Sequence, residues 1–152
     1  MQPIDLAEIL VETLNDKSAY EFSQDFTAIR SYVPYWELKD LRELRVTVLV
    51  PSWVSSRHDR GRWLAEVTVQ IGVQVKLEVP PSSDAADAAG YLMTAADPYQ
   101  TLLYDISAVL RDNPHQGEAN LMTITEIPYD SDHIQQNVYT GLINLTYQMI
   151  RG

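Results

Sequence analysis

The sequence contains no cysteine, which excludes disulfides, thiolate metal ligands and cysteine nucleophiles together. Basic residues are also scarce, because 11 Lys and Arg stand against 21 Asp and Glu, giving a formal net charge of −10. Affinity for a polyanion comes mainly from Lys and Arg. The overall charge therefore argues against a protein that grips nucleic acid.

Long hydrophobic runs are absent too, and none approaches the ~20 residues of a membrane-spanning helix. The opening stretch, MQPIDLAEILVETLND, carries acids and lacks the basic start of a secretory signal. We therefore expect a soluble protein made in the cytosol, with no membrane partner. Its 152 residues, 45% of them apolar, predict a single domain over 1–152 with a sizeable core.

Motifs that carry chemistry are missing as well. The glycines are too isolated for a phosphate-binding loop, and three histidines far apart in the sequence do not suit a zinc site (His58, His115, His133). Asp130 and Asp132 lack the Gly and distal Glu of a calcium loop, so a turn explains them better. We expect no catalytic residue, no metal and no cofactor, and hence no enzyme.

The most informative stretch is residues 62–78, RWLAEVTVQIGVQVKLE, in which every odd position from Trp63 to Leu77 is apolar. A strict period of two predicts a strand with one buried face. The even positions at its centre are uncharged: Thr68, Gln70, Gly72 and Gln74.

This strand is long for its protein. It would extend about 50 Å at roughly 3.3 Å per residue, whereas a compact chain of this length is about 40 Å across. Either a bulge at Gly72 curls the strand around its own core, or the hairpin reaches past the body. In the second case Thr68, Gln70 and Gln74 face a neighbouring subunit, because uncharged polar groups are buried at little cost.

Periodicity predicts the remaining elements. Helical spacing indicates an amphipathic helix over 3–16 and a main packing helix starting near Pro98, whose fixed φ suits a first turn. Strands are expected at 26–33, 44–50, 119–128 and 137–151, with an elaborated loop at 51–61 and another loop at 129–136. The fold class is therefore α+β: a mainly antiparallel sheet with a long protruding hairpin, 44–78, packed by two helices in the order α-β-β-β-α-β-β.

Charge is unevenly distributed along the chain. Residues 84–132 hold nine acids against one base, whereas six of the eleven bases lie between 39 and 62. This is either a solvated acidic surface or a polar molecule suited to head-to-tail association. Trp53, Arg57, Arg60 and Arg62 crowd the hairpin tip, and Trp and Arg are typical of interface hot spots. The tip is thus either a mobile loop or an element that docks on the acidic surface of a neighbour.

The order of these stretches resembles a known family. A first helix, then FTAIRSYVPYWELKDLRELRVTVLVP, WLAEVTVQIGVQVKLE after an Arg-containing loop, a long helix and the closing VYTGLINLTYQMIR are similar to the small neck proteins of tailed bacteriophages, the tail-terminator or tail-completion class. The likeness spans most of the chain but lies in pattern and order, with no invariant motif.

The resemblance implies a non-enzymatic virion protein that assembles in the host cytoplasm into a homo-oligomeric ring, usually of six subunits. Such a ring caps the tail tube, contacts the tail-tube protein and the head-side connector, and lets DNA pass through its lumen. An acidic lumen would help DNA to slide without binding, and the acidic segment 84–132 is compatible with such a lumen. Two alternatives stay open: another phage tail or head-completion component, and a non-phage α+β binding domain that dimerises through its hairpin.

Overall fold

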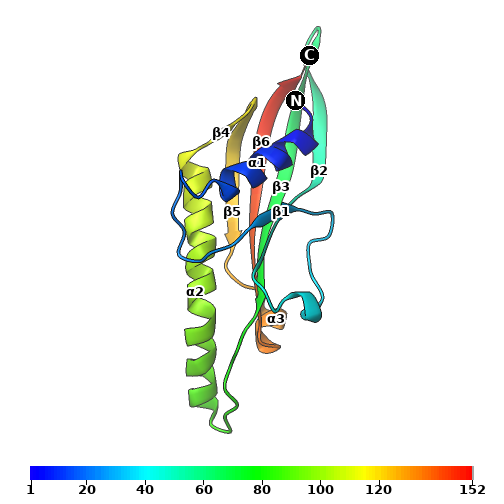
Figure 1. Cartoon of the computed structure of the whole chain (residues 1–152). Coiled ribbons are helices and arrows are strands. Elements are labelled where there is room, and N and C mark those ends of the chain that lie inside the picture. Colours follow the sequence, from blue (N-terminus) through cyan, green and yellow to red (C-terminus); the bar gives the residue numbers. More distant parts are fainter. Residues whose placement is uncertain (152) are drawn as a thin grey trace.

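The computed structural model describes residues 1–151 and shows one six-stranded sheet with α1 and α2 against one of its faces (Figure 1). The strands lie in the order β1-β2-β3-β6-β5-β4, and every pairing except the short parallel β1–β2 contact is antiparallel. The α+β class predicted from the sequence is therefore confirmed.

The elements follow one another along the chain in this order: α1 Pro3–Asn15, β1 Ala28–Arg30, the 3-10 turn η1 Leu38–Asp40, β2 Arg45–Asp59, β3 Arg62–Lys76, α2 Ala85–Asp112, β4 His115–Gln116, β5 Ala119–Ile127, α3 Ser131–Gln135 and β6 Val138–Arg151. The first helix, β3 and the two closing strands lie where periodicity placed them, and β2 begins where it was expected but extends further. The sequence analysis did not anticipate β4 or the short α3 within the expected loop 129–136.

The alternating strand β3 buries its odd face as predicted. Ala65, Val67, Val69, Ile71 and Val73 are fully buried and join a single core with α1 and α2. Leu6 and Leu10 of α1 and Leu102, Leu103 and Ile106 of α2 complete the same core. Trp63 departs from the pattern, because it is 50% exposed near the hairpin end, where neither helix covers the sheet.

The length of β3 is accommodated by an elongated body. β6 pairs with β3 from Trp63–Arg151 to Lys76–Val138 without a register shift, so no bulge occurs at Gly72. The hairpin is consequently no free arm: β3 is covered by β6 over its full length, and only the end of the hairpin rises beyond the other elements (Figure 1). On the β3 side the hairpin is therefore completed by β6 of the same chain, whereas its completion by another subunit on the β2 side stays a prediction.

The expected loop 51–61 is also wrong, because β2 continues as a regular strand to Asp59. A register shift between Leu49 and Ser52 accommodates Pro51, and no strand lies on the outer side of β2 there. Proline is tolerated at such an edge bulge because no ladder hydrogen bond is lost. A tight turn at Arg60–Gly61 then joins the two strands, and Gly61 donates its N–H to the Asp59 carboxylate at 3.3 Å.

The main helix begins earlier than predicted. α2 runs from Ala85, not from near Pro98, and Pro98 lies inside it. The true start is capped by Asp84, whose carboxylate accepts the N–H groups of Ala86 at 2.8 Å and Asp87 at 3.2 Å. The N-terminal half of α2 extends past the lower end of the sheet (Figure 1).

Candidate functional site

In the part of the chain that the structure describes, the sheet has two strand edges that are largely unpaired. On one flank β1 covers β2 only opposite Val46–Val48, so the outer half of β2 has no neighbour on its outer side. On the other flank β4 covers β5 only at Ala119–Asn120. Unpaired edges present rows of free N–H and C=O groups that readily accept another strand. Both flanks are therefore candidate assembly surfaces.

Of the predicted hairpin-tip residues, Trp53 and Arg57 lie on β2, Arg60 lies in the turn and Arg62 begins β3. Trp53 is opposite Val67 and 53% exposed, and Arg57 is opposite Trp63. Arg62 is held within the chain, since its Nε donates to the Asp59 carboxylate at 2.7 Å. The Arg62 contact lowers the pKa of the exposed Asp59. Among the residues that the structure describes, Arg57 and Arg60 form no ion pair, so they remain available to a partner.

The face of the sheet opposite α1 and α2, called here the open face, is uncharged in its central rows, whereas Glu66 lies on the same face nearer the hairpin end. Its central rows carry hydroxyl and amide side chains from four strands: Ser52, Thr68, Gln70, Asn144, Thr146, Thr123 and Thr125. Thr68 and Gln70 are part-exposed, and the Gln70 amide donates to Asn144 Oδ1 at 3.1 Å. Whether these two residues face a partner stays a prediction.

The prediction that Gln74 faces a neighbouring subunit is wrong. Its side chain is only 2% exposed, because the segment after β1 crosses the open face at this level. Gln74 Oε1 accepts the backbone N–H of Trp36 at 3.0 Å, and Gln74 Nε2 donates to Thr140 Oγ1 at 3.0 Å. Gln74 therefore fixes a loop of its own chain and is not a surface for another subunit. The sequence pattern gave Gln74 and Gln70 the same interpretation, because it does not show that a loop covers Gln74 and leaves Gln70 part-exposed.

We expect Gln74→Met to lower the free energy of unfolding by about 1–3 kcal/mol, because the Trp36 N–H and the Thr140 hydroxyl lose a buried partner. The measurement is urea unfolding followed by circular dichroism. Gln70→Met on the same strand and face is the matched control, with an expected change within about 0.5 kcal/mol. Equal losses in the two variants would contradict the assignment of Gln74 to a buried network.

The β5 flank carries much of the acidic segment. A cleft of about 680 Å³ between α2 and β5 is lined by Asp97, Tyr104, Arg111 and Glu126 among others. Glu126 accepts a hydrogen bond from the buried Ser107, and the Arg111 guanidinium lies over the Tyr104 ring at 5.3 Å. The acids of α2 lie on the helical side of the sheet, away from the open face (Figure 1).

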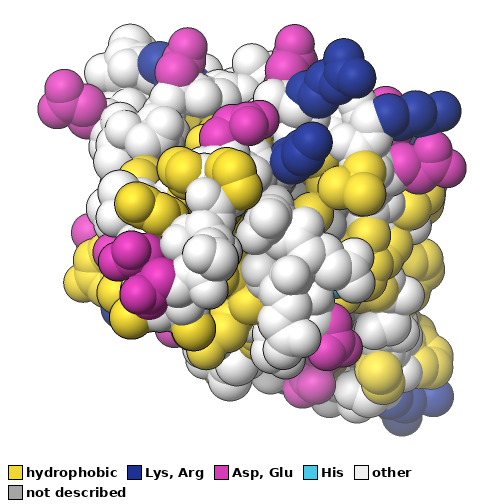
Figure 2. Space-filling model, turned by 90° about the horizontal axis from the view of Figure 1, so that it is seen from below, with side chains coloured by type: hydrophobic (Ala, Val, Ile, Leu, Met, Phe, Trp, Pro, Cys, Tyr) yellow, Lys and Arg dark blue, Asp and Glu magenta, His cyan; other side chains and the backbone are white. Residues whose placement is uncertain are grey.

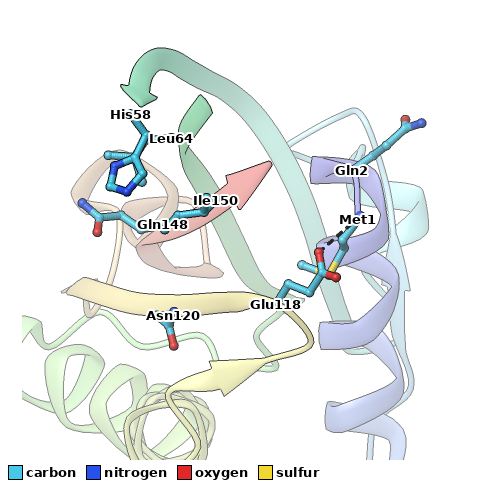
Figure 3. Close-up of a pocket in the computed structure, with 8 residues that line it drawn as sticks. All are labelled: Met1, Gln2, His58, Leu64, Glu118, Asn120, Gln148 and Ile150. Atoms are coloured by element: carbon cyan, nitrogen blue, oxygen red, sulfur yellow. Dashed lines mark hydrogen bonds and ion pairs between the residues drawn. The ribbon is translucent and has the colours of Figure 1, made fainter. Parts of the chain in front are cut away.

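A second cleft, of about 710 Å³, lies at the upper end of the molecule (Figure 3). Glu118, in the turn between β4 and β5, pairs with the N-terminal amine of Met1 at 3.4 Å. His58, Asn120 and Gln148 line the same cleft. Gly117 of this turn has φ +59°, a left-handed conformation that glycine adopts without strain.

The histidines are used separately. His58 lines the upper cleft, His115 contacts Asn120, and His133 Nδ1 lies 2.7 Å from Thr140 Oγ1. The Asp130 carboxylate accepts the backbone N–H groups of Asp132 and His133, both at 2.9 Å, as expected for a turn. The His133 hydrogen bond lowers the pKa of Asp130. Over residues 1–151 no three metal-binding side chains converge.

Sequence reasoning missed an exposed apolar loop after β1, formed by Tyr32, Val33, Tyr35 and Leu38. From the lower end, hydrophobic side chains are exposed between acidic ones, and several Lys and Arg side chains gather on one side (Figure 2). In the described part of the chain, no helix is both long and apolar enough to cross a membrane.

In comparisons with known proteins, no protein-family model matches the chain, and no match to a curated protein was found.

Proposed function

We propose that this protein is a structural subunit of a tailed-phage particle, which assembles into a homo-oligomeric ring at the head–tail neck. In this role it terminates the tail tube, joins it to the head-side connector and performs no catalysis. The order of elements supports the phage assignment through its resemblance to tail-terminator and tail-completion proteins.

One observation carries the ring: the sheet has an unpaired strand edge at each of its two flanks, on β2 and on β5. Two different complementary surfaces on one subunit produce head-to-tail association, which closes into a ring when the rotation between copies allows it. Arg57 and Arg60 near the end of β2, and Glu118 and Glu126 beside and on β5, favour this arrangement.

The closest alternative is a two-fold dimer in which the β2 edges of two copies pair with each other. The exposed Trp53 and Val54 on that edge favour it. Another phage tail or head-completion component would share the same edges but differ in partner. The genes that flank this one distinguish a phage from a non-phage origin, because a neck protein is expected among other virion genes and a non-phage binding domain is not.

Negative-stain electron microscopy with light scattering tests the assembly. We expect closed rings with a central hole for the wild-type chain. Thr68→Lys and Gln70→Lys form rings as well if the joint lies at the strand edges, because both residues lie on the open face. Failure of both variants to assemble would instead place the joint on that face, and a species of two subunits would overturn the ring.

A further inference from the structure

The free edge of β5 is shorter than the free edge of β2. On β5 the uncovered stretch runs from Met122 to Ile127, because Leu121 still donates its N–H to Pro114 at 2.8 Å. On β2 the last contact with the β1 segment is the Ser31 N–H donated to the Val48 carbonyl at 3.0 Å. The residues of β2 beyond this point, through Asp59, are therefore open to another strand.

Strand direction favours pairing between these two edges. β2, β3, β6 and β5 alternate in direction, so β2 and β5 of one copy run antiparallel. A rotation about an axis along the strands preserves direction, so β5 of one copy meets β2 of the next in antiparallel orientation. The joint therefore continues the same kind of ladder that connects the strands within each copy.

The free stretches of β2 and β5 also determine a register for their pairing. When they are centred on each other, Ser56 lies opposite Thr123, Val54 opposite Thr125 and Trp53 opposite Glu126, in antiparallel order. Ser56, Val54, Thr123 and Thr125 all belong to the open face, so the pleats of the two strands agree.

The offset between copies also suits closure. Within one copy Ile124 lies at the level of Val69, near the bulge of β2 that follows Leu49. Centring the edges displaces the next copy by about four residues over four strands, or about one residue per strand. A stagger of that size accompanies a strand tilt of about 36° in closed barrels.

Charge complementarity identifies a second copy as the occupant. In this register Ser52–Arg57 lie opposite Ile127–Met122, and beyond Arg57 the hairpin bends out of the ladder, because β4 already occupies the neighbour's β5 edge at Ala119–Asn120. The tip, with Arg60, then lies beside β4 and the β4–β5 turn, which carries Glu118, while Asp112 ends the preceding helix. Two positive charges of that flank are already engaged: the N-terminal amine of Met1 pairs with Glu118 at 3.4 Å, and Arg111 is held over Tyr104. The edge of β5 itself bears a single charged side chain, Glu126, so no repulsion opposes pairing.

We propose that the outer half of β2 in one copy pairs antiparallel with Met122–Ile127 of β5 in a second copy, so that the four long strands of all subunits form one continuous sheet. This inference depends on the proposed ring and specifies its joint. The open face then lines the central opening, and among the side chains of its central rows, from the Ser52 level to the Gln70 level, none is charged. The lumen is therefore neutral at this level, which differs from the acidic lumen with which residues 84–132 are compatible.

The cysteine-free chain permits a direct test by cross-linking. Ser56→Cys and Thr123→Cys are made as separate proteins, each with one exposed thiol. They are mixed and treated with a bis-maleimide of about 8 Å reach, which covers opposite and diagonal neighbours on paired strands. We expect covalent dimers in the mixture, none with either protein alone, and a ladder of multimers from the double variant. Ser82→Cys mixed with Ser56→Cys is the control and is expected to give no product.

The outcomes separate the joint from the function. Cross-linking of Ser56→Cys alone would reveal a two-fold β2–β2 joint and overturn the inference. Rings seen by electron microscopy without cross-links between positions 56 and 123 would overturn this joint but leave the proposed ring intact. Absence of any assembly at the highest soluble concentration would contradict both proposals.

Discussion

Replacing Ile71 with Asp is expected to unfold the protein. Ile71 is fully buried between Val48 on β2 and Ile143 on β6, in the centre of the core face. Removal of its side chain loses about 1.5–3 kcal/mol of hydrophobic burial, and an unpaired buried carboxylate adds several kcal/mol more. The sum is comparable with the whole stability of a typical domain, about 5–15 kcal/mol.

Far-ultraviolet circular dichroism and thermal unfolding measure this effect. Gln70→Asp is the matched control, because it introduces the same group one residue away on the part-exposed open face. Its expected cost is within about 1 kcal/mol, in the range of surface substitutions. A native spectrum and an unchanged melting temperature for Ile71→Asp would contradict the assignment of the odd residues of β3 to the core.

Alternation in β3 was a reliable signal because a half-buried strand must place successive side chains on opposite faces. The same logic located β5 and β6. It did not say what covers the polar face, and for this reason Gln70 and Gln74 received the same interpretation although only Gln74 is buried. Burial of Gln74 depends on a loop more than thirty residues earlier, which contributes the Trp36 N–H.

The two errors at prolines have one physical origin. Proline removes a backbone donor, so Pro51 was expected to end a strand and Pro98 to begin a helix. At Pro51 the strand lies at an edge with a bulge, where the donor is not needed. At Pro98 the helix continues because the Asp84 cap and the Ala-rich stretch before it favour a start at Ala85. Local rules state where proline is costly, and tertiary position decides whether that cost arises.

The candidate site was predicted in part. Composition located the tip by its arginines and its tryptophan, but it assigned them to a loop, since WVSSRHDR lacks the strict alternation of β3. Strand structure there follows from antiparallel pairing with β3 across the tight turn, which the side-chain pattern of this stretch does not signal. The β5 edge was unforeseen because a free edge depends on the order of strands in the sheet.

The double substitution Arg57→Glu with Arg60→Glu is expected to abolish assembly while leaving the subunit folded. Both side chains are exposed, so the melting temperature of the monomer should change by no more than a few degrees. In the proposed joint, however, the tip lies beside the neighbour's β4–β5 turn, and reversal places like charges near Glu118 and Asp112. Like-charge contacts across an interface cost several kcal/mol. We expect at least a tenfold loss of assembly, most visible near 0.05 M salt, where screening is weak.

Light scattering across a salt series measures this loss, and two comparisons make it specific. Lys39→Glu with Arg42→Glu changes the net charge equally but lies near η1, away from the tip, and should assemble as the wild type does. Asp112→Arg with Glu118→Arg, mixed with the tip variant, should restore mixed assemblies, because the charges are exchanged across the joint. Glu118 also pairs with the N-terminal amine, so this variant's own melting temperature is checked first. Normal assembly of the tip variant at every salt concentration would show that Arg57 and Arg60 are solvated residues with no part in the joint.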